Sequence, residues 1–353
     1  MTWKDRAVAA TRKSKLCALD KALIRERRLT FLRKVAKCSR MPKGLLVHNT
    51  KAGSLDEELL PKLVSALGEV VSVDIGQLGE AGDALQYAED NHCEWIAVAG
   101  GDGSVERVAS NLIDTTFPLG IISAGTFNNF ARSLDLPLDP IEACHVILAG
   151  NVQPTDVGFA NGKPFFECLG SGLDAALYPL GEEIKSGRVH RSLDFIGRAY
   201  RYPRQKFVLA LDRPACDALV RGSTNESNRL IHFLKRNRRS NLTLSALMLP
   251  VSNGPYFGMN FAVAPEQRMD DGLLTVSVFS RYSKLQLWWH FASIAFGRRQ
   301  YSPKSITFRV AKLQVDGPRK LPVHLDGSPQ QDFWPFDAEC KKGALRVFRK
   351  TRH

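Results

Sequence analysis

Residues 95–104 have the sequence Trp95-Ile96-Ala97-Val98-Ala99-Gly100-Gly101-Asp102-Gly103-Ser104, an apolar run that passes straight into a glycine-rich turn. The run predicts a buried strand, and the turn leads into a helix. Glycines let the backbone come close to a ligand, and the free N–H groups that open a helix favour an anion such as phosphate. Because Asp102 would repel a bare anion, the turn indicates phosphate with Mg²⁺, and a plain tight turn is the alternative.

A second stretch, residues 121–130, again passes from a strand through a glycine turn to a helix: Ile-Ile-Ser-Ala-Gly-Thr-Phe-Asn-Asn-Phe. The carboxyl ends of parallel strands share one edge of a sheet, so we expect both turns, and Asn49 after the first strand, to converge on one crevice. The sequence has neither G-x-x-x-x-G-K-[S/T] nor a G-x-G-x-x-G that opens a first βαβ unit. It therefore supports neither a P-loop enzyme nor a standard dinucleotide dehydrogenase.

Strand and helix patterns alternate around these two turns, which predicts a parallel sheet with helices on both faces. We expect this α/β nucleotide-binding domain to span residues 44–154. The expected strands are 44–48, 70–75, 95–99 and 119–122, and the expected helices are 55–67, 81–91, 104–113, 127–134 and 141–149.

From residue 155 to residue 353 the pattern changes to short extended segments separated by Gly, Pro and Asn, which predicts an antiparallel β-sandwich domain. The C-terminal segment of this domain can return to the first domain. A helical pattern over 284–296 carries Trp288, Trp289 and Phe291, which either pack in the core or insert into lipid. The expected strands are 165–169, 207–211, 242–249, 260–264, 274–279, 305–310, 312–315, 322–325 and 344–348.

Charge is concentrated at the start of the chain. The net charge is +13 over 353 residues, and residues 1–43 contain fourteen Lys or Arg against three acidic residues. We expect this basic extension to form an amphipathic helix over 16–36 that either binds an anionic membrane surface or packs on the body. Nucleic acid is a further anionic partner, but we do not expect it here.

Seven cysteines without C-x-x-C spacing predict a reducing compartment. The sequence shows neither a secretory signal nor a run of apolar residues that could span a bilayer. We therefore expect a cytoplasmic protein that associates peripherally with a membrane, and a homodimer is an open alternative for its assembly.

Taken in order, these segments resemble the diacylglycerol kinase catalytic-domain family of lipid kinases, which includes sphingoid and ceramide kinases and small bacterial lipid kinases. The resemblance covers about residues 44–349. The matching stretches are 47–53, 100–104, 119–131 with 136–137, 253–255, 264–265, 270–274, 325–327 and 343–345.

The resemblance implies an ATP-dependent kinase that transfers the γ-phosphate to the hydroxyl of a diacylglycerol-like or sphingoid-like lipid. It implies catalytic roles for Asp326 and Asp102, and Mg²⁺ bound by Asp271 with the backbone of Arg268 and Leu273. The implied nucleotide-binding residues are Asn49, Gly100, Gly101, Asp102, Gly103, Ser104, Val105, Glu106, Arg107, Gly125, Thr126 and Asn128, with Leu78 at a further nucleotide contact.

Three positions depart from the family pattern. Ser328 replaces the Glu of Asp-Gly-Glu, Glu106-Arg107 replaces Asn-Glu, and Asn128-Asn129 replaces Asn-Asp. Some small bacterial members use that Glu to accept a proton, which Ser cannot do, so the chain either uses Asp326 or Asp102 or transfers phosphate slowly or not at all. The alternative function is therefore a weak or inactive nucleotide- and lipid-binding member. A NAD kinase, which shares Gly-Gly-Asp-Gly, is a further alternative that the Asp-Asp-Gly-Leu-Leu at 270–274 disfavours.

Overall fold

The structure is a computed structural model of the whole chain, and its contacts separate residues 1–42 from residues 43–353. Apart from Pro42, the described residues all belong to the second unit, so the expected amphipathic helix at 16–36 lies outside them. They are 42–49, 55, 58–78, 83–178, 197–198, 200–210, 241–258, 261–262, 264–280, 283, 285–286, 289 and 306–351.

Four parallel strands form one end of a ten-stranded sheet, in the order β2-β1-β3-β4. Successive residues of a strand point to opposite faces, so Leu45 and Val47 are buried on one side of the sheet and Leu46 on the other. Both faces therefore need a cover. The strands are β1 (Gly44–His48), β2 (Val70–Asp74), β3 (Trp95–Gly100) and β4 (Leu119–Ser123).

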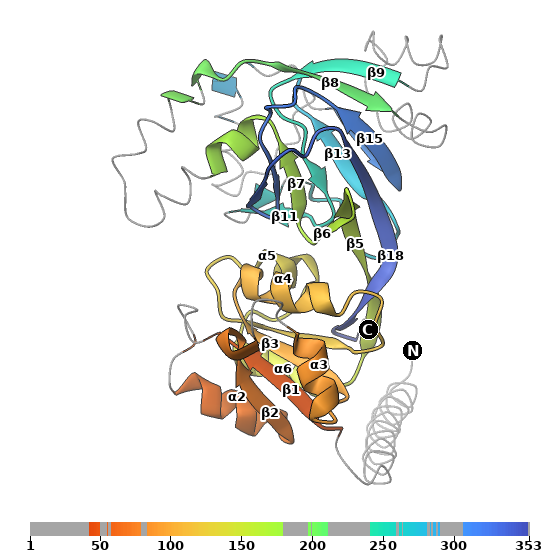
Figure 1. Cartoon of the computed structure of the whole chain (residues 1–353). Coiled ribbons are helices and arrows are strands. Elements are labelled where there is room, and N and C mark those ends of the chain that lie inside the picture. Colours follow the sequence, from red (N-terminus) through yellow and green to blue (C-terminus); the bar gives the residue numbers. More distant parts are fainter. Residues whose placement is uncertain are drawn as a thin grey trace, which may run out of the picture. The chain divides into compact units, whose positions relative to one another are not determined.

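Helices cover both faces of these strands (Figure 1). Helices α3 (Ala84–Asp90) and α4 (Asp102–Asn111) pack on the Leu45 side, and α2 (Leu59–Leu67) and α6 (Pro140–Leu148) pack on the Leu46 side. Capping fixes where two of them start. The side chains of Asp83 and Asp139 accept backbone N–H groups in the first turns of α3 and α6.

The second half of the chain forms two facing layers of antiparallel strands. One is a six-stranded sheet in the order β14-β13-β10-β7-β16-β17, and the other is the far end of the large sheet. Their shared core includes Phe207 and Leu313 from the large sheet and Val276 and Leu325 from the small one. The small sheet consists of β7 (Cys168–Ser171), β10 (Val251–Ser252), β13 (Leu274–Val278), β14 (Ile306–Val310), β16 (Val323–Leu325) and β17 (Ser328–Gln330).

The remaining strands extend the large sheet, apart from a separate hairpin of β11 (Tyr256–Phe257) and β12 (Phe261–Ala262). The strand β18 pairs in parallel with β4 and antiparallel with β5 and β15, so it runs through both halves (Figure 1). These strands are β5 (Val152–Ala160), β6 (Lys163–Phe165), β8 (Gln205–Ala210), β9 (Asn241–Ala246), β15 (Lys312–Asp316) and β18 (Phe336–Phe348).

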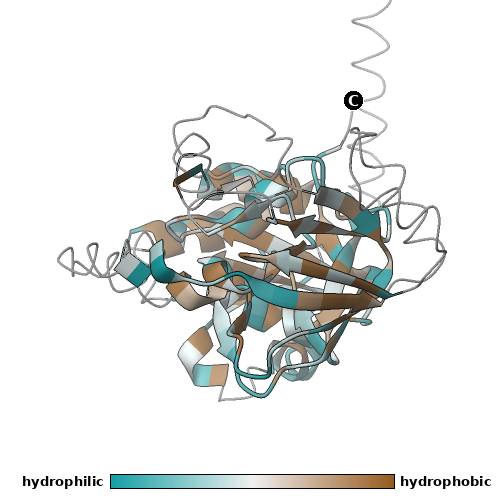
Figure 2. Cartoon of the chain, turned by 90° about the horizontal axis from the view of Figure 1, so that it is seen from above, coloured by the Kyte–Doolittle hydropathy of each residue, from teal (hydrophilic) through white to brown (hydrophobic). Residues whose placement is uncertain are grey.

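The expected fold class is confirmed: an α/β lobe is followed by an antiparallel β-sandwich. Figure 2 shows hydrophobic segments along the strands and helices of both lobes. One expected strand is wrong. Residues 165–169 divide into the ends of β6 and β7, because the N–H groups of Phe166 and Glu167 donate to a side chain and not to a neighbouring strand.

Several other expectations shift. The sequence did not predict the strand β5, although the predicted domain boundary at residue 154 lies within it. The helix α2 begins at Leu59, whereas the sequence predicted a helix from residue 55. Most of the expected helix at 284–296 lies outside the described residues. Its described members Leu285 and Trp289 are 75% and 66% exposed, so they do not belong to the core that we considered for this helix. Within the described ranges, no helix is long and apolar enough to cross a bilayer.

The packing of β18 into the α/β lobe can be tested at Leu345, which is fully buried in the core of that lobe. Leu345→Ala should lower the free energy of unfolding by about 2–5 kcal/mol, because it removes buried methyl groups and leaves a cavity. The neighbouring Arg346 is exposed, and Arg346→Ala should change the free energy by less than about 0.5 kcal/mol. Urea unfolding followed by circular dichroism measures both variants. Equal midpoints for the two would contradict this packing.

Candidate functional site

The loops after β1, β3 and β4 meet, as the sequence predicted. A Cβ added to Gly125 would lie 2.4 Å from the Cα of Gly101, so the two glycine turns touch backbone to backbone. The Asn49 side chain donates to Ser104 Oγ at 2.8 Å, which joins the loop after β1 to the start of α4. Only glycine at both turns allows this close approach.

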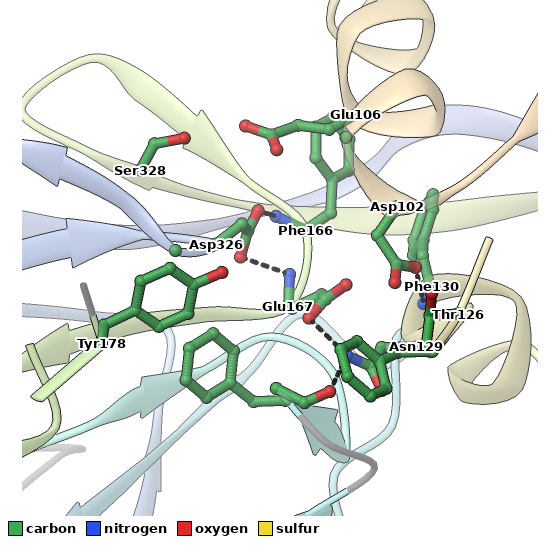
Figure 3. A pocket seen from close by; sticks show the side chains of 15 residues that line it. Asp102, Glu106, Thr126, Asn129, Phe130, Phe166, Glu167, Tyr178, Asp326 and Ser328 are labelled. Carbon is green, nitrogen blue, oxygen red and sulfur yellow. Dashed lines mark hydrogen bonds between the residues drawn. The ribbon is translucent and has the colours of Figure 1, made fainter. Parts of the chain in front are cut away.

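Next to these turns lies a cavity of about 860 Å³ whose walls come from both lobes (Figure 3). Its charged lining residues are all acidic: Asp102, Glu106, Glu167 and Asp326. The other lining residues are Gly103, Thr126, Phe127, Asn129, Phe130, Phe166, Tyr178, Phe257, Gly258, Gly327 and Ser328. The cavity therefore combines carboxylates and aromatic rings, and its described lining contains no Lys, Arg or His.

Three backbone N–H groups hold the carboxylate of Asp326. Its Oδ1 accepts from Glu167 at 2.9 Å and Cys168 at 2.7 Å, and its Oδ2 accepts from Phe166 at 2.5 Å. Asp326 itself has a positive φ of 45°, in a tight turn completed by Gly327. Burial raises the pKa of Asp326 to about 6, although the three N–H donors oppose that shift.

The second glycine turn and the start of α5 (Asn129–Ser133) surround Asp102. Its Oδ1 accepts the N–H of Phe130 at 3.3 Å, and burial raises its pKa while the backbone N–H groups of residues 128–130 lower it. The Asn128 side chain both accepts from the Gly125 N–H and donates to the Gly125 carbonyl, so it closes the turn. Asp102 thus ties the first glycine turn to the helix after the second.

Glu167 is the most deeply enclosed of the four carboxylates, at 6% exposed. Its Oε2 accepts from Asn129 Nδ2 at 3.1 Å, and the same nitrogen donates to the Gly258 carbonyl at 2.9 Å (Figure 3). Burial, followed by the charges of Asp102 and Asp326, raises the pKa of Glu167 well above its usual value. Glu167 therefore favours its protonated form while the cavity holds no cation.

Glu106 shares the α4 face with Asp102, one helical turn away. Burial, then the charges of Asp326 and Asp102, raises the pKa of Glu106 to about 8. Like charges at i and i+4 destabilise a helix by roughly 0.2–0.5 kcal/mol, so this spacing does not arise from helix stability.

Aromatic rings form the wall on the β-sandwich side. Tyr178 and Phe257 stack with ring centroids 6.0 Å apart, and both contact the buried ring of His324. His324 Nδ1 accepts the N–H of Gly327 at 3.2 Å, and a Cβ at Gly327 would lie 2.0 Å from the Tyr178 hydroxyl. The wall therefore also fixes the turn that carries Asp326.

The structure brings Asp102, Gly103, Glu106, Thr126 and Asp326 together as cavity-lining residues. The other predicted nucleotide-binding residues lie behind or beside the cavity. Asn49, Gly100, Gly101, Ser104, Gly125 and Asn128 build the turns, Val105 packs in the core, Arg107 follows on α4, and Leu78 ends the 3-10 helix η1 (Ile75–Leu78). Their contacts with nucleotide stay predictions.

The predicted Mg²⁺ ligands lie together at another turn, but their oxygens already have partners. The carbonyls of Arg268 and Leu273 both accept from Gln267 Nε2 at 2.6 Å. The Asp271 carboxylate accepts from Arg309 at 2.5 Å and from the Leu273 N–H. The predicted Mg²⁺ ligands thus lie close together, and their binding of Mg²⁺ stays a prediction. Among the described residues, no group of three His, Cys, Asp or Glu could hold a metal ion.

Sequence reasoning missed Glu167, Tyr178 and Phe257. Glu167 carried a usable signal, because it is a single carboxylate inside the apolar run 165–169. Tyr178 and Phe257 carried none, since one aromatic residue in an ordinary segment is more often part of a core.

Two family models match the chain. The diacylglycerol kinase catalytic domain matches residues 43–160, and the YegS C-terminal NAD kinase beta sandwich-like domain matches residues 236–349. The chain therefore contains a segment similar to the diacylglycerol kinase catalytic domain, followed by one similar to the YegS C-terminal domain.

Named relatives point to the same class. The chain is 24% identical over 315 residues to a protein of Klebsiella pneumoniae named probable lipid kinase YegS-like, covering 87% of this chain and 96% of the relative. It is 26% identical to a protein of the same name from Cronobacter sakazakii, covering 82% and 91%. A crystal structure of a putative diacylglycerol kinase from Bacillus anthracis matches the fold with a TM-score of 0.64 at 22% identity, over 88% of this chain and 98% of that one.

The raised pKa of Glu106 has a consequence for stability. Between its ordinary value of 4.5 and about 8, the folded protein keeps a proton that the unfolded chain has released. The free energy of unfolding should therefore fall as pH rises through this range, and Glu106→Gln should reduce that fall. Urea unfolding at pH 5, 6.5 and 8 measures it. The exposed Glu89 on α3 provides the control, and a pH dependence that is the same in Glu106→Gln and Glu89→Gln would contradict the burial effect.

Proposed function

We propose that this protein transfers the γ-phosphate of ATP to the hydroxyl group of a lipid. The observation that carries the proposal is the cavity where the two touching glycine turns face Asp326 and an aromatic wall. The match to a diacylglycerol kinase catalytic domain, and the similarity to relatives named probable lipid kinases, support the same reaction.

The α/β lobe supplies the nucleotide side of the cavity. The glycine turns bring backbone close to the cavity, and α4 begins at Asp102 with N–H groups that favour phosphate. ATP carries Mg²⁺ on its phosphates, and the bound ion neutralises part of their charge. We assign that ion to the nucleotide phosphates, and the turn at Asp271 stays a separate predicted Mg²⁺ site.

The β-sandwich lobe supplies the acceptor side. Phe166, Tyr178 and Phe257 offer apolar surface that an acyl or alkyl chain can contact, and Asp326 is fixed beside them by three N–H groups. A lipid lying on this wall would present its hydroxyl next to the carboxylates. Holding the two reactants in line is the largest part of catalysis in phosphoryl transfer.

The decisive experiment measures labelled phosphate transfer from ATP with Mg²⁺ into a panel of diacylglycerol, monoacylglycerol, phosphatidylglycerol, sphingosine and ceramide, with NAD included. We expect a labelled lipid, and we expect Asp326→Asn to lower its formation by about 10²-fold, because the turn that orients the site is disturbed. Asn has one acceptor oxygen in place of two, so at least one of the three N–H groups of residues 166–168 loses its acceptor.

Asp332 provides the matched control, because it is an exposed aspartate that also has a positive φ. Asp332→Asn should keep the wild-type rate. Binding of ATP without any labelled product would favour the nucleotide- and lipid-binding alternative that Ser328 suggests. A labelled NAD would replace the lipid kinase with a NAD kinase.

We further propose that the chain binds anionic membrane surfaces. The basic extension supports this through its charge, and the exposed Leu285 and Trp289 add apolar side chains that can enter a bilayer. A lipid substrate also requires access to a membrane.

This membrane proposal predicts binding to phosphatidylglycerol vesicles and much weaker binding to phosphatidylcholine vesicles. Each basic residue near such a surface contributes about 1 kcal/mol, so replacing Arg25, Arg27 and Arg28 together by Ala should lower binding roughly 100-fold. Replacing the exposed Lys320, Arg346 and Lys350 removes the same charge from the body and should have little effect. Vesicle sedimentation measures the bound fraction of each variant, with duplex DNA added as a competitor. Equal losses in both triple variants, or preference for DNA, would contradict the proposal.

A further inference from the structure

Three of the four carboxylates in the cavity are held by hydrogen-bond donors. Asp326 accepts three backbone N–H groups, Asp102 accepts the N–H of Phe130, and Glu167 accepts the amide of Asn129. Each of these bonds favours the ionised carboxylate and lowers its tendency to take a proton. These bonds suit Asp326 and Asp102 to be fixed negative charges, whereas burial and the neighbouring charges keep Glu167 in its protonated form.

Glu106 differs from these three. Within the described part of the chain, no hydrogen bond to its carboxylate is found, although it lines the cavity and is largely buried. Figure 3 shows its side chain extending from α4 toward the wall that carries Asp326 and Ser328.

The charges around Glu106 come from three elements. Asp102 lies on its own helix, Glu167 lies between β6 and β7, and Asp326 follows β16. All are carboxylates, and Arg132 is the cation whose charge acts on Asp102. Glu106 is therefore surrounded by negative charge without a positive partner in the cavity lining.

We propose that Glu106 is the proton acceptor of the phosphoryl transfer, in the role that the family assigns to the Glu replaced here by Ser328. The inference rests on the proposed function. The proton of the lipid hydroxyl passes to a Glu106 carboxylate oxygen, and the lipid oxygen forms a bond to the γ-phosphorus of ATP. The bond from that phosphorus to the β,γ-bridging oxygen breaks, and its electron pair leaves on ADP.

The position of Glu106 fits this role in two ways. It approaches the Asp326 carboxylate from the α/β lobe, so the lipid hydroxyl can lie between the nucleotide side and the aromatic wall. Its pKa of about 8 also lies close to the operating pH, where a group accepts protons most efficiently in a transition state. Asp326, with a lower pKa and three N–H donors, remains a fixed charge that orients the site.

The test compares the pH dependence of lipid phosphorylation in wild type, Glu106→Gln and Glu89→Gln. Wild type should gain rate as pH rises through the ionisation of Glu106. Glu106→Gln should lower kcat by about 10²- to 10⁴-fold, lose that rise, and leave KM for ATP within about threefold. Glu89→Gln, on the exposed face of α3, should match wild type.

A rescue variant separates proton transfer from a structural role. Ser328→Glu places a carboxylate on the opposite wall. The double variant with Glu106→Gln should have a kcat at least about tenfold higher than Glu106→Gln alone. Failure of this rescue together with an unchanged pH profile would overturn the assignment. Wild-type kcat in Glu106→Gln would also overturn it while leaving the proposed kinase intact.

A measurement without catalysis completes the design. In protein labelled with ¹³C-glutamate, one side-chain carboxyl should titrate near pH 8 and be missing from Glu106→Gln. A Glu106 signal that titrates at the ordinary value of 4.5 would overturn the assignment even in an active kinase. Absence of any phosphate transfer by wild type would overturn the proposed function and this assignment together.

Discussion

The site depends on the carboxylate of Asp326, which accepts three backbone N–H groups from residues 166–168. These bonds interrupt what would be one continuous strand and turn its backbone toward the cavity. As a result β6 pairs with β5 while β7 joins the small sheet, and Glu167 faces the cavity from the break. Without a carboxylate at this turn, three buried N–H groups would lack partners, at about 1–3 kcal/mol each.

The electrostatics of the cavity follow from this arrangement. Four carboxylates share a largely buried space, so each one raises the free energy of ionising the others. Backbone donors lower this cost for Asp102 and Asp326, and a bound cation or a proton must offset it for Glu106 and Glu167. A cavity of this kind is suited to a reaction that brings positive charge with its nucleotide and releases a proton from its acceptor.

Sequence patterns predicted the fold well where they were long and periodic. The buried strands 44–48 and 95–99 and the two glycine turns lie as expected, because apolar runs and glycines constrain local backbone directly. The convergence of the turns also followed from the geometry of parallel strands. Two features could not be predicted. The break at Phe166 depends on a side chain far away in the sequence, and the contacts of Gln267 and Arg309 with the predicted metal ligands arise only in the folded chain.

The strand β18 gives the chain a particular kind of cooperativity. It completes the parallel sheet beside β4 and, along its length, pairs with β5 and β15 of the sandwich. Neither lobe therefore has its full set of strands until residues from opposite ends of the described fold have met. Contacts between such distant segments slow folding, and they make the two lobes gain and lose structure as one unit. The cavity between the lobes is kept by this shared strand, so its walls assemble only with the whole fold.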